Sequence, residues 1–102
     1  GIDCSGFTQM VYKINGYKIL RDAKDQATQG VTLSFIEESE PGDLAFFHND
    51  NDEIIHVGII LKDNHIIHAS GKVRIDRLDQ SGIYNNEKNK HTHSLRYIKK
   101  II

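Results

Sequence analysis

The stretch EIIHVGIILKDNHIIHAS, residues 53–70, contains two runs of apolar, largely β-branched residues with a polar triplet, residues 62–64, between them. Runs of this kind, bounded by polar turn residues, are typical of β-strands joined in a hairpin. One histidine interrupts each run, His56 in the first and His68 in the second. The stretch therefore predicts an antiparallel hairpin with one histidine on each strand.

The length of the turn decides whether the two histidines share a face of the sheet. A two-residue turn at Asp63 and Asn64 would pair Lys62 with His65 and put the two rings on opposite faces. A three-residue turn instead pairs Leu61 with His65, which leaves both rings on one face with Cβ atoms about 7 Å apart. Asn64 tolerates the left-handed conformation that such a turn needs. We therefore expect the three-residue turn.

The same register puts Gly58 on the face of the two histidines, where it leaves room for a substrate or for another element.

Further strand-like runs surround the hairpin at residues 43–48, 72–78 and 93–102. We expect the polar stretch DQSGIYNNEKNKHTH, residues 79–93, to be one long loop.

The single cysteine, Cys4, lies in GIDCSGFTQMVYKI, residues 1–14. Apolar residues recur after it at intervals of three and four, the spacing of one face of a helix. These residues are Phe7, Met10, Val11 and Ile14. We expect the helix to end at Asn15–Gly16, where glycine suits the left-handed cap position. Cys4 then lies at the helix N-terminus, where unpaired N–H groups and the helix dipole favour a thiolate.

A second helix is expected within residues 21–30, with Asp22 as its N-cap and Gly30 at its end. Helices followed by consecutive strands indicate the α+β class, with N-terminal helices packed on an antiparallel β-sheet.

Composition bounds the possible functions. The chain of 102 residues has 13 basic and 14 acidic residues, a net charge of −1 and no apolar run of transmembrane length. Neither a nucleic-acid interface nor a membrane span is indicated. One cysteine permits no internal disulfide. We expect one domain, residues 1–102, and the absence of an initial methionine suggests that it is excised from a longer chain.

Cys4, His56 and His68 have the residue types of a nucleophile, a base and a base-orienting group. Each has a simpler interpretation, because a lone cysteine is usually a small core residue and a histidine in an apolar strand is usually structural. The three side chains could also bind zinc. The sequence places no carboxylate behind either histidine, however, as zinc-binding histidines usually require. We therefore expect no metal and no cofactor. The other four histidines lie at strand ends or in polar loops: His48, His65, His91 and His93.

Four short blocks in this order resemble the signature of the NlpC/P60 family of bacterial cell-wall cysteine peptidases. They are DCSGF at 3–7, PGDLAFF at 41–47, HVGII at 56–60 and IHASG at 67–71. The resemblance implies a papain-like core in circularly permuted order. It also implies that Cys4 is the nucleophile, His56 the general base and His68 the polar third member.

The RDA motif at residues 21–23 further resembles the subgroup that cleaves γ-D-glutamyl-L-diamino acid bonds in peptidoglycan stem peptides or their fragments. The resemblance implies that Asp3 binds the ammonium of an N-terminal L-Ala and that Arg21 binds a free α-carboxylate. Ser5 could bind substrate or cap the helix, and Asp22 could orient Arg21 or cap the second helix.

Family members of this subgroup usually carry N-terminal SH3-like domains, so we expect such domains in the full chain. The resemblance implies a periplasmic or cell-surface location, or a cytoplasmic one if the enzyme recycles wall peptides. Two alternatives remain open. One is a CHAP-type peptidoglycan amidase, against which DCSGF and RDA argue, and the other is a catalytically inactive domain that binds wall fragments.

Overall fold

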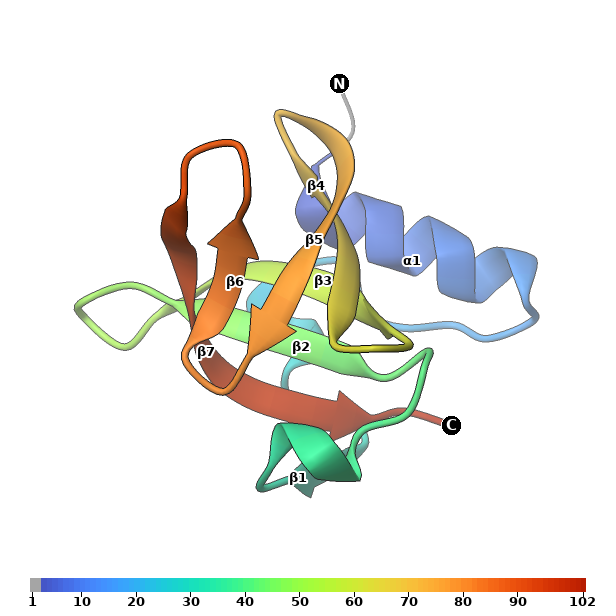
Figure 1. Ribbon diagram of the computed structural model, residues 1–102. Coiled ribbons are helices and arrows are strands. Elements are labelled where there is room, and N and C mark those ends of the chain that lie inside the picture. The colour runs from blue at the N-terminus through green and yellow to red at the C-terminus, as the bar shows by residue number, and fades with distance from the viewer. Residues whose placement is uncertain (1–2) are drawn as a thin grey trace.

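The computed structural model describes residues 3–102 (Figure 1). Both α-helices precede the strands in the chain. The elements in chain order are α1 (Cys4–Ile14), α2 (Ala23–Gln26), β1 (Val31–Leu33), the 3₁₀ helix η1 (Ile36–Glu38), β2 (Leu44–His48), β3 (Ile54–Leu61), β4 (His65–Ser70), β5 (Lys72–Asp79), β6 (Gly82–Asn85) and β7 (Lys90–Lys100).

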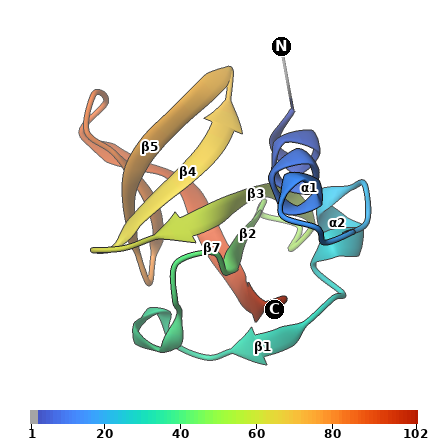
Figure 2. The same ribbon diagram turned by 90° about the vertical axis from the view of Figure 1, so that its right-hand side faces the viewer.

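The strands form one antiparallel sheet that closes on itself. Each strand from β2 to β6 pairs with the strand that follows it, and the last strand, β7, also pairs with β2. This pairing makes a six-stranded barrel, and β1 extends the sheet beside β7. Helix α1 lies across β3 and β4 on the outside (Figure 2). The α+β class and the packing of helices on an antiparallel sheet are confirmed, and closure of the sheet is a feature that the sequence patterns did not predict.

The β3–β4 hairpin has the predicted three-residue turn. Leu61 pairs with His65, and Asp63 and Asn64 have left-handed φ angles of 58° and 59°. Only three residue pairs join the strands, the last being Ile59 with Ile67. Beyond this point β3 and β4 diverge toward α1 (Figure 2).

The expectation of free space beside Gly58 is wrong. A Cβ atom at this position would lie 2.6 Å from Cδ1 of Ile66 and 3.0 Å from Cβ of His68. Gly58 therefore admits neighbouring side chains of β4, not a substrate or a helix.

The expectation of a long loop at residues 79–93 is also wrong. This segment contains β6 and the beginning of β7, whose pairing closes the barrel. Gly82 makes the close approach possible, because a Cβ atom there would lie 1.8 Å from the carbonyl oxygen of His93. Ile83 is fully buried and anchors β6 in the barrel interior.

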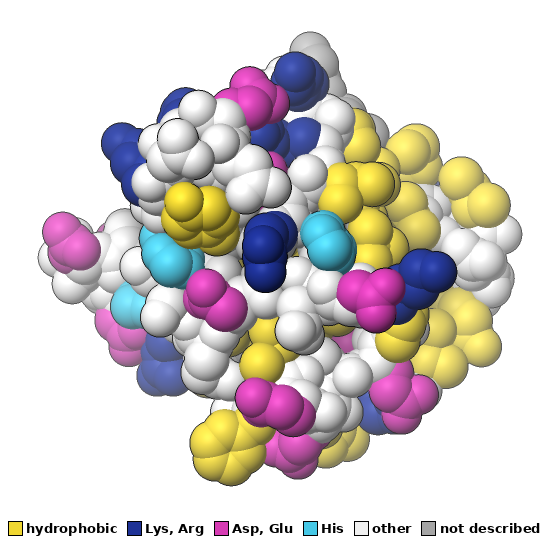
Figure 3. Space-filling model, in the orientation of Figure 1, with side chains coloured by type: hydrophobic (Ala, Val, Ile, Leu, Met, Phe, Trp, Pro, Cys, Tyr) yellow, Lys and Arg dark blue, Asp and Glu magenta, His cyan; other side chains and the backbone are white. Residues whose placement is uncertain are grey.

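Helix α1 has the predicted bounds, and Phe7 and Val11 of its predicted apolar face pack on the core, but Met10 and Ile14 do not. It ends at the C-cap Asn15. Met10 and Ile14 are exposed, at 44% and 76%, whereas Thr8 and Tyr12 are buried with Phe7. Thr8 tolerates burial because its hydroxyl contacts the side-chain oxygen of Gln26 at 2.9 Å and the carbonyl oxygen of Ser5 at 3.0 Å. Figure 3 shows apolar side chains gathered on the right of the view, over α1, and others scattered over the rest of this face.

Helix α2 is shorter than expected, with four residues. Asp22 occupies its N-cap position without a side-chain capping bond. Gln26 ends the helix as a buried side chain whose amide donates to the carbonyl groups of Ser5 and Leu20. These bonds tie α2 to α1, and the chain then turns at Gly30 into β1.

Two apolar clusters form the core. One lies between the helices and the sheet and contains Phe7, Tyr12, Ile19, Ala27, Leu44, Phe46, Val57, Ile59 and Ala69. The other fills the barrel and contains Ile36, Ala45, Phe47, Ile60, Ile66, Leu78, Ile83 and Ile98. Neither helix among residues 3–102 has the length and apolar character needed to cross a membrane.

Candidate active site

Cys4 is a free, half-buried thiol in the first turn of α1. It packs against the core cluster that includes Val57 and Ala69, the residues that directly follow His56 and His68. The N-terminal end of α1 lies beside the end of β4 in Figures 1 and 2. The helix thus brings Cys4 to the side of the sheet where β3 and β4 have separated.

His56 and His68 share a face of the sheet, as the turn length predicted. Nε2 of His56 lies 2.8 Å from Nδ1 of His68, and the rings meet edge to face with centroids 5.0 Å apart. Both side chains are buried, with exposed fractions of 6% and 1%. The bond uses Nε2 of His56, so Nδ1 of this residue takes no part in it.

Burial keeps both rings neutral. It lowers the pKa of His56 to about 3, with a further lowering from the nearby His93 and His68. Burial also lowers the pKa of His68, against the opposing hydrogen bond and charge of Asp76. A neutral imidazole can accept a proton, so His56 has the protonation state that a general base requires.

A buried carboxylate lies behind His68, contrary to the expectation from sequence. Oδ2 of Asp76 is 2.8 Å from Nε2 of His68, and Arg74 donates to both carboxylate oxygens, at 2.7 and 3.1 Å. Burial acts to raise the pKa of Asp76, but the bonds from Arg74 and His68 outweigh it and hold the pKa below its usual value. Asp76 is therefore ionised.

The sequence does contain a signal for Asp76. Gly71, with φ of 72°, is the single residue between β4 and β5, and this turn pairs His68 with Arg74 and Ile66 with Asp76. The parity rule used for the first hairpin would have put Asp76 on the face of His68.

His93 is a third histidine in the cluster, and it lies in the segment that was expected to be a loop. Its ring stacks on that of His56, with centroids 4.2 Å apart and planes inclined by 24°. Burial lowers the pKa of His93 to about 4, with a further lowering from His68. The ring therefore covers His56 as a neutral, flat surface.

The predicted substrate-binding residues also come together, around the side chain of Arg21. Asp3 caps α1 by accepting from the backbone N–H of Gly6 at 2.6 Å, and its other oxygen accepts from Arg21 at 2.8 Å. Arg21 also donates to the hydroxyl of Ser5 at 3.0 Å. A carboxylate oxygen of Asp22 lies 4.0 Å from Nη1 of Arg21, an exposed contact too long for a hydrogen bond. Asp3 and not Ser5 is the helix cap.

Asp3 and Arg21 each stabilise the charged form of the other. The hydrogen bond from Arg21 is the main cause of the lowered pKa of Asp3, and the Gly6 N–H adds to it. The same hydrogen bond raises the pKa of Arg21, and the charge of a Cys4 thiolate acts weakly in the same direction. A paired cation and anion therefore lie beside the thiol.

Comparisons with known proteins identify the family of the chain. Residues 1–95 match the NlpC/P60 family. The chain belongs to the NlpC/P60 family. Gamma-D-glutamyl-L-lysine dipeptidyl-peptidase of Bacillus subtilis (strain 168) is 39% identical to it over 71 residues, which are 68% of this chain and 24% of that protein. The chain therefore spans about a quarter of the length of this curated relative.

Solved structures share the fold over the whole described chain. An NlpC/P60 family protein from Bacillus cereus ATCC 10987 superposes with a TM-score of 0.79 at 29% identity, over 99% of this chain and 32% of that one. RipD from Mycobacterium tuberculosis, a non-catalytic NlpC/p60 domain protein adapted to peptidoglycan binding, superposes with a TM-score of 0.75 at 20% identity, over 100% of this chain and 68% of that one. The latter likeness concerns the fold alone.

The NlpC/P60 histidine pair does not have the geometry of a zinc site. Nε2 of His56 and Nδ1 of His68 point at each other across 2.8 Å, so the two nitrogens cannot also ligate one ion. Among residues 3–102, no group of three or more His, Cys, Asp or Glu side chains is arranged so that it could hold a metal ion.

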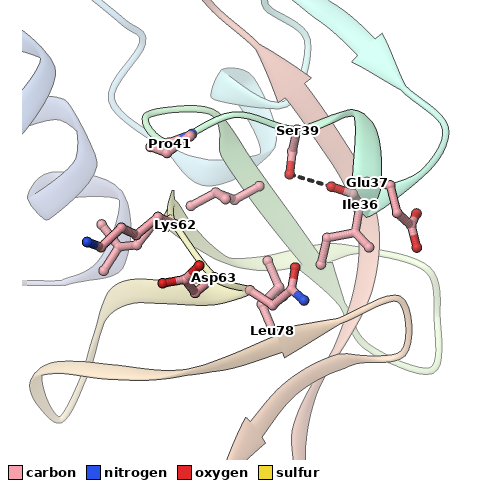
Figure 4. A pocket seen from close by; sticks show the side chains of 10 residues that line it. Ile36, Glu37, Ser39, Pro41, Lys62, Asp63 and Leu78 are labelled. Atoms are coloured by element: carbon pink, nitrogen blue, oxygen red, sulfur yellow. Dashed lines mark hydrogen bonds between the residues drawn. The ribbon is translucent and has the colours of Figure 1, made fainter.

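A pocket of about 260 Å³ lies away from this NlpC/P60 site (Figure 4). Its lining includes Ile36, Lys62, Asp63 and Leu78, and therefore the turn at the opposite end of β3 from His56. The hydroxyl of Ser39 in this pocket donates a hydrogen bond to the carbonyl oxygen of Ile36, at 2.6 Å. The pocket is thus remote from the thiol and the histidines.

Proposed function

We propose that this NlpC/P60 domain is a cysteine peptidase that hydrolyses the γ-D-glutamyl-L-diamino acid bond of peptidoglycan stem peptides or their fragments. Cys4 is the nucleophile, His56 is the general base and His68 orients the ring of His56. The observation that carries the proposal is the buried 2.8 Å bond between the two histidines, on the strands that the cysteine helix covers.

The proposed reaction uses Nδ1 of His56. Because Nε2 is bonded to His68, Nδ1 is the nitrogen available to take the thiol proton of Cys4 as the sulfur attacks the amide carbonyl. The imidazolium then gives this proton to the leaving amine, and water hydrolyses the thioester with His56 again as the base. The N–H of Cys4, in the first turn of α1, has no partner within the helix and serves as a donor to the oxyanion.

The pair of Asp3 and Arg21 supports the choice of substrate. A γ-linked D-glutamate has a free α-carboxylate, and an N-terminal L-Ala before it has a free ammonium. Arg21 is the natural partner of the carboxylate, and Asp3 is the natural partner of the ammonium. The two side chains lie 2.8 Å apart beside the thiol, and the Ser5 hydroxyl accepts a further hydrogen bond from Arg21 at 3.0 Å.

A peptidoglycan substrate puts the activity in the periplasm or at the cell surface when the wall is remodelled. It puts the activity in the cytoplasm if the enzyme recycles wall peptides.

The test of the proposal is hydrolysis of L-Ala-γ-D-Glu-L-Lys, with products identified by mass spectrometry. We expect L-Ala-D-Glu and L-Lys from the wild-type protein and no products from Cys4→Ala. Cleavage of intact muropeptides at the amide bond to the sugar would indicate the CHAP-type amidase instead. Binding of muropeptides without cleavage would indicate an inactive wall-binding domain, as RipD is described to be.

A further inference from the structure

The buried carboxylate of Asp76 bears on the positions of the protons in the histidine pair. Asp76 is 3% exposed, and both of its oxygens are bonded. An ionised carboxylate can only accept hydrogen bonds, so Nε2 of His68, at 2.8 Å, must be the nitrogen that bears the proton.

The proton on Nε2 determines the state of the other ring nitrogen of His68. A neutral imidazole has one N–H and one bare nitrogen, so Nδ1 of His68 is an acceptor. The atom that faces it is Nε2 of His56, at 2.8 Å, which must therefore be the donor. The lone pair of His56 is then on Nδ1, the nitrogen that the proposed mechanism uses as the base.

We propose that Asp76 is a positioning residue that fixes the tautomers of both His68 and His56 and so keeps the lone pair of His56 on Nδ1. The inference rests on the proposed function for its consequence in catalysis, but the tautomers themselves can be observed without turnover. Without an acceptor at Asp76, His68 is free to bear its proton on Nδ1. It would then donate to Nε2 of His56, whose own proton would move to Nδ1, and the base would be lost.

The donors of Arg74 determine how an amide side chain at position 76 would be oriented. Its Nε donates to the same oxygen, Oδ2, that accepts from His68, while its Nη2 donates to Oδ1 and also to Glu87 at 3.2 Å. An asparagine at position 76 would therefore turn its carbonyl oxygen toward His68 and Nε of Arg74. In this orientation its amide NH₂ group faces only one donor, Nη2 of Arg74, whereas in the flipped orientation it would face two. Asp76→Asn should keep the tautomers, whereas Asp76→Ala should not.

The first measurement is the ¹⁵N spectrum of the histidine rings in the wild-type protein at neutral pH. We expect a protonated Nε2 and a bare Nδ1 for both His56 and His68. A protonated Nδ1 on either ring would overturn the proposal without the need for any variant.

The second measurement compares Asp76→Ala, Asp76→Asn and the matched control Asp79→Ala. Asp79 is on the same strand and also contacts a histidine, His91 at 2.8 Å, but this pair is exposed and lies outside the site. Loss of the correct tautomer in a triad reduces kcat by up to about 10⁴-fold. For Asp76→Ala we expect mixed tautomers and a kcat at least about 10²-fold lower with KM little changed.

Asp76→Asn should keep the wild-type ring spectrum and most of kcat, and Asp79→Ala should match the wild type in both. Unchanged tautomers in a folded Asp76→Ala variant would overturn the proposal. If the wild-type protein cleaves none of the peptides, the proposed function fails, and the ring spectra still decide the role of Asp76.

Discussion

At the scale of single residues, the histidine pair depends on hydrogen-bonding capacity more than on charge. His68 is neutral, and its Nδ1 lies 2.8 Å from Nε2 of His56. An orienting residue of this kind needs an acceptor at the right place and no ionisable group. The residue types Cys, His and His were recognisable in the sequence because two histidines interrupt apolar strands. Asp76 was overlooked because its strand, KVRIDRL, has charged residues on both faces.

This view of His68 predicts an order among its variants. His68→Asn should lower kcat less than His68→Ala, because an amide oxygen can still accept from Nε2 of His56. We expect a difference of about 10-fold or more, which corresponds to about 1.4 kcal/mol. The measurement is kcat on the tripeptide at saturating concentration. Equal losses for the two variants would show that His68 does not orient His56.

A second prediction concerns the free amine of the substrate. If Asp3 binds the ammonium of L-Ala, acetylation of this nitrogen should lower kcat/KM. The effect should be about 10-fold, because Asp3 is 59% exposed and already paired with Arg21. The comparison uses free and N-acetylated tripeptides with the wild type and Asp3→Asn, and acetylation should matter less for the variant. Equal rates of the wild type on both peptides would mean that the amine is not recognised.

At the scale of elements, the length of a turn could be predicted from the sequence more readily than the buried face of a helix. The Lys62–Asn64 turn followed from chain length and from the tolerance of Asn64 for a left-handed φ, and it fixed the register of both histidines. The buried face of α1 was misjudged in part because Thr8 satisfies its hydroxyl internally, a fact that no spacing of apolar residues reveals. Strand β6 was missed because four residues, two of them Gly82 and Asn85, make no strand pattern.

The closure of the barrel at β6 and β7 can be tested through Gly82. Its φ of 145° and the backbone oxygen of His93 leave no room for a Cβ atom. Gly82→Ala should lower the free energy of unfolding by at least about 2 kcal/mol, measured by urea denaturation.

The matched control is Gly71→Ala. Gly71 also has a positive φ, of 72°, but a Cβ atom there would meet nothing within 4 Å. This substitution should cost only about 1 kcal/mol. A Gly82 variant as stable as the Gly71 variant would contradict the close pairing of β6 with β7.

At the scale of the whole molecule, the site is formed where the elements meet. α1 supplies Cys4, β3 and β4 supply the paired histidines, β5 supplies Asp76, and β7 supplies His93. Helices followed by an antiparallel sheet could be predicted from the order of the patterns along the chain. Closure of the barrel could not, because it depends on β7 pairing with β2, about 50 residues earlier in the chain. Closure is also what brings His93 against His56.

Burial of a neutral His56 in this closed structure predicts loss of stability in weak acid. The pKa of His56 is about 3 in the folded protein and about 6.5 in the unfolded chain. Below pH 6.5 the unfolded chain therefore binds a proton that the folded protein does not, and stability falls as pH falls. Between pH 7 and pH 5 we expect a loss of about 2 kcal/mol from His56, measured by urea denaturation.

The same experiment has a matched pair of variants. His56→Gln should reduce this dependence on pH, because the titrating group is removed. His91→Gln, at an exposed histidine outside the site, is the matched control for the substitution itself. If His56→Gln kept the full dependence, His56 would not be held neutral by the fold.

In the proposed reaction, Cys4 forms a thioester with the γ-D-glutamyl group of the substrate. The most direct measurement is the mass of the protein after acid quenching during turnover of L-Ala-γ-D-Glu-L-Lys, followed by mapping of the modified peptide. We expect an added L-Ala-D-Glu acyl group on the peptide that contains Cys4, and no such adduct on Cys4→Ala, which should also be inactive. Hydrolysis of the tripeptide by Cys4→Ala at the wild-type rate would show that Cys4 is not the nucleophile.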